Sequence, residues 1–90
     1  MVYMITYDLN SPGQKYDDVI QAIKDCSVGV WCTFWKSSYM IKSYLSAQQI
    51  SDKITPLLDG NDRLIVIKVT NDYQGWLAED EWDYIRKMFD

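Results

Sequence analysis

Histidine is absent from this 90-residue sequence, and cysteine, proline and glycine are scarce. Without histidine, the chain has no imidazole for acid–base catalysis, for a Ser-His-Asp triad or for a His-ligated zinc site. Its two cysteines, Cys26 and Cys32, have a spacing that matches no zinc or redox motif. We therefore expect both to be reduced, buried thiols.

Positive charge is also in short supply. Nine Lys and Arg residues stand against thirteen Asp and Glu residues, which gives a net charge of −4. Sequence-independent binding to nucleic acid needs a basic surface, so the composition disfavours it without excluding a local basic patch. No apolar run approaches the ~18 residues of a membrane span, and the first residues do not resemble a signal peptide. We expect a cytoplasmic protein that does not enter a membrane.

Hydrophobic residues, in contrast, make up 48% of the chain, and the pattern they form predicts a single domain over residues 1–90. Apolar runs rich in β-branched and aromatic residues predict strands, and apolar residues at helical spacing predict helices. Ser46 and Gln49 form a capping-box pattern, and Pro56 predicts a helix end or kink near Thr55. In order, the expected elements are a strand at 2–7, a helix at 14–25, strands at 30–35 and 39–43, a helix from 47, a strand at 63–69 and a helix at 79–89.

The order strand, helix, strand, strand, helix, strand is that of the ferredoxin-like α+β fold, here with an additional C-terminal helix. Right-handed crossovers then predict an antiparallel sheet in which the strands lie in the order four, one, three, two. The strands at 30–35 and 63–69 are apolar on both sides. Since both faces of such a sheet should be covered, we expect the last helix or a second subunit to cover the second face, and we favour a homodimer.

A candidate site follows from the first strand, which ends on the first charged residue of the chain, Asp8. The turn residues after it lead into a helix, and a helix N-terminus attracts anions. A carboxylate beside an anion site usually needs a mediating cation, so we expect Mg²⁺ or Mn²⁺ if a metal is bound. The alternative is that Asp8 or Asn10 only caps the turn or the helix.

The same topology predicts which residues join Asp8. We expect the end of the first strand to meet the end of the third strand and the start of the fourth. Aromatic side chains there, Tyr7, Tyr44 and Trp76, are candidates for stacking on a base. Besides these aromatic residues, the residues expected near this edge are Asn10, Gly13, Gln14, Ser43, Asp62 and Arg63.

Several segments carry a family resemblance. They are Ile5 to Tyr16, Ser46 to Ile50, Asn61 to Val69, and Asn71 to Leu77. Together they resemble the SinR family, which is related to the CRISPR-associated protein two superfamily. The resemblance implies a ferredoxin-like fold and dimers built sheet against sheet. In the nuclease branch of that superfamily, an Asp at the end of strand one is the proposed metal ligand, and Asp8 matches its position.

Two functional hypotheses follow. The first is a homo-oligomeric module that binds a nucleotide-like or protein partner without catalysis, for example a sequestering protein of a mobile element or a defence system. The alternative is a metal-dependent phosphodiesterase or endonuclease in which Asp8 from two subunits holds one divalent ion, with Asn10, Ser43 and Arg63 orienting a phosphate. An RNA-recognition module is disfavoured because residues 38–43 lack its aromatic and basic signature. A structural dimer without chemistry stays open.

Overall fold

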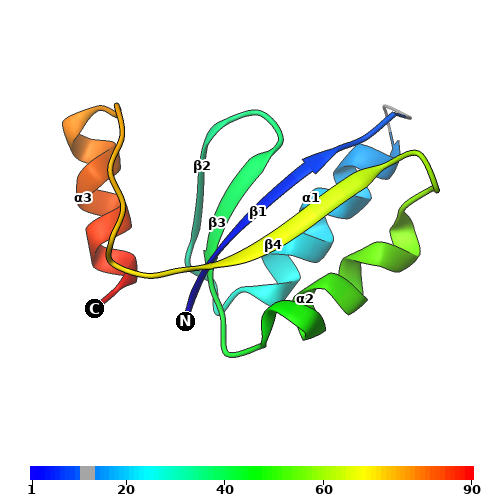
Figure 1. Ribbon diagram of the computed structural model, residues 1–90, viewed down its shortest axis with the longest axis horizontal. Coiled ribbons are helices and arrows are strands. Elements are labelled where there is room, and N and C mark those ends of the chain that lie inside the picture. Colours follow the sequence, from blue (N-terminus) through cyan, green and yellow to red (C-terminus); the bar gives the residue numbers. More distant parts are fainter. Residues whose placement is uncertain (11–13) are drawn as a thin grey trace.

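The computed structural model describes residues 1–10 and 14–90, which form one sheet with helices on both sides (Figure 1). The predicted elements are all present, with boundaries within one residue of those expected. The Pro56 position ends the second α-helix in a short 3₁₀ helix, as predicted. In chain order the elements are β1 (Val2–Asp8), α1 (Gln14–Cys26), β2 (Trp31–Trp35), β3 (Ser38–Lys42), α2 (Ala47–Ile54), η1 (Thr55–Leu57), β4 (Arg63–Val69) and α3 (Glu79–Met88).

The sheet has the strand order β2-β3-β1-β4, and every neighbouring pair is antiparallel. This is the ferredoxin-like α+β arrangement with an added C-terminal helix, which confirms the predicted fold. Strand β1 lies in the interior of the sheet, hydrogen-bonded to β3 on one side and to β4 on the other. Its polar end is therefore flanked by two other strands.

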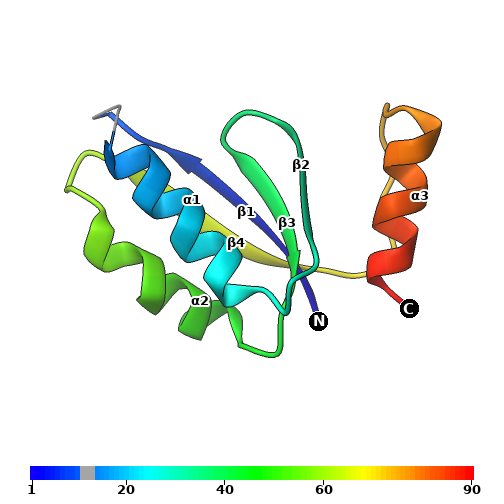
Figure 2. The ribbon, with the colours of Figure 1, turned by 180° about the vertical axis from the view of Figure 1, so that it is seen from behind.

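Helices α1 and α2 pack on one side of the sheet, which we call the helix face (Figure 2). The capping box at the start of α2 is present: the Ser46 hydroxyl accepts from the Gln49 amide, and the Gln49 side chain accepts from the Ser46 amide. Side chains at alternate positions of β1 point to this face because successive side chains of a strand point to opposite faces. The fully buried residues here include Ile5, Val19, Ile23, Ile41, Ile50 and Ile54.

Helix α3 packs on the opposite side, which we call the second face (Figure 1). Its Ile85 and Met88 are buried against Val2, Cys32 and Met40 of the sheet. Tyr73, in the segment that leads to α3, stacks on Trp82 at 5.9 Å between ring centroids. Cys26 and Cys32 are both free and buried, as predicted, and burial raises the pKa of the Cys32 thiol to about 11.

No helix in the described part of the chain is both long enough and apolar enough to cross a membrane.

Candidate functional site

The end of β1 meets the start of β4 and the start of β3. In the antiparallel register Asp8 pairs with Arg63, and Thr6 pairs with Ser38. We call this edge of the sheet, where β1 ends and β3 and β4 begin, the rim. The turn between β2 and β3 lies at the rim, where the Tyr7 amide donates to the Ser37 carbonyl oxygen at 3.2 Å. The expected meeting of β1 with β4 is confirmed, whereas the expected meeting with the end of β3 is wrong.

Ser43 and Tyr44 accordingly lie at the opposite end of the sheet, because antiparallel neighbours bring opposite ends together. The Ser43 amide donates to the Met1 carbonyl oxygen at 2.8 Å. Its buried hydroxyl donates to the Cys26 carbonyl oxygen at 2.6 Å and accepts from the Leu45 amide at 3.1 Å. Ser43 thus links the end of α1 by hydrogen bonds to the segment between β3 and α2. The neighbouring Tyr44 is 87% exposed.

Asp8 is exposed and belongs to the other side of the sheet from α1. The alternation of β1 places it on the second face with Val2 and Met4. Its strand partner Arg63 instead donates to the carbonyl oxygens of Gly60 and Asp62, at 3.2 and 2.8 Å. Within residues 1–10 and 14–90, no three His, Cys, Asp or Glu side chains gather as a metal site.

The carboxylate that does lie beside the start of α1 is Asp62. Its side chain is fully buried, and it accepts hydrogen bonds from the Asn10 amide at 2.9 Å, the Asp59 amide at 2.9 Å and the Lys15 ammonium at 2.8 Å. These three donors, the two amides foremost, lower the pKa of Asp62 to about 2. Lys15 also pairs with Asp59, and its hydrogen bonds to Asp59 and Asp62 raise its pKa.

This cluster has a structural role that accounts for Asn10 as well. The Asn10 side-chain amide donates to the Asn61 carbonyl oxygen, so both its backbone and its side chain bind the 59–62 loop. The cluster already neutralises Lys15, the cation nearest the start of α1. Gly13 lies outside the described residues, and Gln14 is described only as the first residue of α1.

A second group of polar side chains lies on the helix-face side of the same rim. Tyr7 is 5% exposed, and its hydroxyl has no hydrogen-bond partner among the residues that the structure describes. The Tyr16 ring packs edge-on against the Tyr7 ring at 5.8 Å, and its hydroxyl lies 3.3 Å from the Ser37 hydroxyl. The Lys36 ammonium lies 5.5 Å from the centroid of the Tyr16 ring. We call this group, with Tyr39, the tyrosine cleft.

The pKa values of the neighbouring Tyr7 and Tyr16 phenols are shifted in opposite directions. Burial raises the pKa of Tyr7, and the adjacent Tyr16 phenol raises it further. Burial acts in the same direction on Tyr16, but the Ser37 and Tyr7 hydroxyls and the Lys36 charge together lower the pKa of Tyr16. At neutral pH Tyr7 is therefore a protonated hydroxyl that can donate a hydrogen bond.

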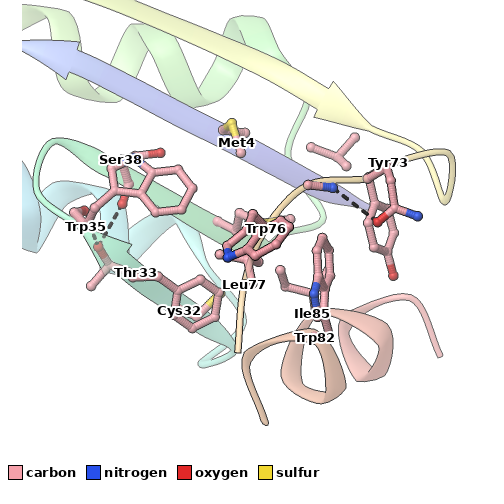
Figure 3. A pocket seen from close by; sticks show the side chains of 15 residues that line it. Met4, Cys32, Thr33, Trp35, Ser38, Tyr73, Trp76, Leu77, Trp82 and Ile85 are labelled. Carbon is pink, nitrogen blue, oxygen red and sulfur yellow. Dashed lines mark hydrogen bonds between the residues drawn. The ribbon is translucent and has the colours of Figure 1, made fainter. Parts of the chain in front are cut away.

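Trp76 belongs to neither group and lies in the segment between β4 and α3 (Figure 3). It is 97% exposed and stands over a pocket of about 180 Å³ on the second face, whose other walls include Met4, Met40 and Trp82. The prediction that Tyr7, Tyr44 and Trp76 lie together is wrong: one is buried under the helix face, one lies at the far end of the sheet, and one lies on the second face.

The sequence interpretation missed Lys15, Lys36, Ser37, Tyr16 and Tyr39 as neighbours of this rim. The signal was available in the predicted antiparallel order, because an antiparallel partner of β1 begins where β1 ends. With that rule, the turn at Lys36 and Ser37 falls beside Tyr7. The buried role of Asp62 had no comparable signal, since it depends on how the 59–62 loop folds against Asn10.

The sequence matches no model of a known protein family, and a comparison with curated proteins likewise finds no match. Membership of the SinR family stays a prediction from the segments described above.

Proposed function

We propose that the chain is a non-catalytic binding module that acts as a homodimer, with two copies joined through the second face of the sheet. The observation that carries the proposal is an apolar surface on that face which α3 leaves uncovered. We call it the open patch, and it consists of Trp35, Ile65, Ile67 and Trp76, which are 55%, 53%, 47% and 97% exposed. Several large apolar side chains exposed on one face of a sheet usually mark an interaction site.

A second copy is the occupant that the charges favour. Asp8 and Arg63 lie side by side at one border of the second face, on neighbouring strands. An interface with twofold symmetry uses the same surface on both copies, so a twofold axis near this border brings Asp8 of one copy to Arg63 of the other. The surface is therefore complementary to itself in charge as well as in apolar character.

The geometry favours a protein partner over a nucleotide-like anion at the start of α1. Lys15, the cation nearest that helix start, is already neutralised by Asp59 and Asp62. The net charge of −4 also opposes a polyanion. A partner that docks on the acidic outer surface of the dimer is consistent with both observations.

Sedimentation equilibrium of the whole chain tests the dimer. We expect a dimer at micromolar concentration and a monomer for the double variant Ile65→Lys/Ile67→Lys, because two charges then face an apolar partner. Tyr44→Ser is the matched control, since it also removes an exposed apolar side chain but at the far end of the sheet. A wild-type chain that stays monomeric at several hundred micromolar would contradict the proposal.

One observation supports the metal-dependent phosphodiesterase as a second candidate. Asp8 lies on the same face as Ile65 and Ile67, so a dimer through that face brings two Asp8 carboxylates toward one interface. An assay of RNA, DNA and cyclic dinucleotide cleavage with Mg²⁺ or Mn²⁺ distinguishes the candidates. Cleavage that is lost in Asp8→Asn favours this second candidate, whereas cleavage that persists in Asp8→Asn rules out the role of Asp8.

A further inference from the structure

The residues of the tyrosine cleft line a cleft of about 340 Å³, which lies between the start of α1 and the β2–β3 hairpin. Its lining is partly polar, from Tyr7, Tyr16, Thr33, Lys36, Ser37 and Tyr39. Ile20, Phe34 and Trp35 supply the apolar part of the lining. The cleft thus combines apolar side chains with several hydroxyl groups and one cation.

The Tyr7 hydroxyl is the feature that needs an explanation. A buried hydroxyl without a hydrogen bond destabilises a fold, so native structures seldom leave one unpaired. This one is almost completely buried and lines the cleft. The Tyr16 phenol lies close enough to raise its pKa, but within the described residues the Tyr7 hydroxyl forms no hydrogen bond. A ligand that accepts a hydrogen bond would satisfy it.

The other polar groups indicate the charge of that ligand. The Lys36 ammonium makes no ion pair with any residue in the described ranges. It lies over the Tyr16 ring, and Lys36 lines the cleft. Tyr7, protonated at neutral pH, is a hydrogen-bond donor. One cation and one buried donor match a monoanion, because a phosphate dianion needs more donors and more positive charge than the cleft offers.

We propose that the cleft binds a small organic carboxylate with a flat apolar body, its carboxylate accepting from the Tyr7 hydroxyl and facing Lys36, its body lying against Phe34 and Trp35. The volume suits a body of one or two fused rings. This site goes beyond the dimer proposed above. Trp35 belongs both to the open patch and to the lining of the cleft. Ile65 and Ile67 do not line the cleft, so the double lysine variant that breaks the dimer alters no residue of the cleft.

Titration of the ¹⁵N-labelled chain with 2-naphthoate, followed by amide chemical shifts, tests the site. A probe of this size should bind with a Kd of roughly 0.1–2 mM. The shifts should concentrate at Tyr7, Ser37 and Tyr39. The uncharged 2-naphthamide and inorganic phosphate should each bind at least about fivefold more weakly, since each lacks one half of the recognition.

Variants then assign the contacts. Tyr7→Phe keeps the ring and should weaken 2-naphthoate by about tenfold, the usual effect of losing a hydrogen bond to a charged group. Lys36→Gln should weaken it by about two- to fivefold, as for an exposed charge. Lys24→Gln is the matched control, because the Lys24 ammonium also lies over an aromatic ring, that of Trp31 at 4.3 Å, but outside the cleft. It should leave the affinity unchanged.

Thermal unfolding of Tyr7→Phe without ligand gives an independent readout. If the hydroxyl is unpaired in the free protein, its removal should leave the Tm unchanged or raise it. A fall of several degrees would show that Tyr7 bonds within the fold, and would overturn the proposal. So would an absence of 2-naphthoate binding at 10 mM, or an equal affinity of wild type and Tyr7→Phe. Binding that survives in the Ile65→Lys/Ile67→Lys variant would support the site even if the dimer fails.

Discussion

The two faces of this sheet are covered to different degrees. On the helix face, α1 and α2 bury a continuous set of isoleucine and valine side chains with almost no exposure. On the second face, α3 covers only the part around Val2, Cys32 and Met40, and the open patch stays exposed. Because buried apolar area stabilises a fold at about 25 cal/mol per Å², the helix face should supply most of the stability and the second face most of the capacity for association.

The largest expected effect comes from Ile5→Ala. Ile5 is fully buried in the central strand between its partners Tyr39 and Val66. Removing a buried isoleucine side chain usually costs about 2–5 kcal/mol, a large share of the ~5–10 kcal/mol typical of a small domain. Urea unfolding followed by circular dichroism measures the loss. A loss below about 1 kcal/mol would mean that the helix face is not the main source of stability.

Ser43→Ala should have the next largest effect. Its buried hydroxyl donates to Cys26 and accepts from Leu45, and removing it leaves both backbone groups short of a partner. We expect a loss of about 1–3 kcal/mol in the same urea experiment. The affinity for 2-naphthoate should not change, because Ser43 lies at the far end of the sheet from the tyrosine cleft. A selective loss of 2-naphthoate binding with intact stability would contradict the position assigned to the ligand.

The fold could be predicted from the sequence, whereas only some of the residues that lie at the rim could be predicted. Hydrophobic periodicity, the capping box at Ser46 and the break at Pro56 all report local backbone preferences, and each is present as predicted. The position of Asp8 beside Arg63 also followed, because it depends only on strand order. Ser43, Tyr44 and Trp76 were misplaced relative to Asp8, the first two by the direction of β3 and the third by the path of a long segment.

The two carboxylates at the rim, Asp62 and Asp8, should differ in how much they contribute to the loss of stability in acid. The pKa of Asp62 is lowered in the folded chain from 3.8 to about 2. Its contribution to stability is therefore fully present above pH 4 or so, and is lost as the pH falls toward 2. We expect Asp62→Asn to lower the Tm at pH 7 by about 5 °C or more and to flatten the fall of Tm between pH 4 and pH 2.

Asp8→Asn is the matched control for that experiment, since the Asp8 side chain is exposed and makes no hydrogen bond or ion pair with any described residue. When the protein is dilute enough to be monomeric, this variant should leave the fall of Tm between pH 4 and pH 2 in place. An equally flattened profile in Asp8→Asn would show that Asp8 has a partner in the folded state, most simply Arg63 of a second copy. Repeating the measurement on the Ile65→Lys/Ile67→Lys variant would then separate a contact within the chain from one across the dimer.

The smallest expected effect is that of Ile67→Ala on the isolated monomer. Ile67 has the same side chain as Ile5 and also lies in a sheet strand, but it is 47% exposed on the second face. Its truncation should change the free energy of unfolding by less than about 0.5–1 kcal/mol when the protein is dilute enough to be monomeric. At high concentration the same variant should be less stable than wild type, because only the wild type gains stability from association. A concentration-independent difference would place the side chain in the monomer's own core, and would remove the open patch as the basis of the dimer.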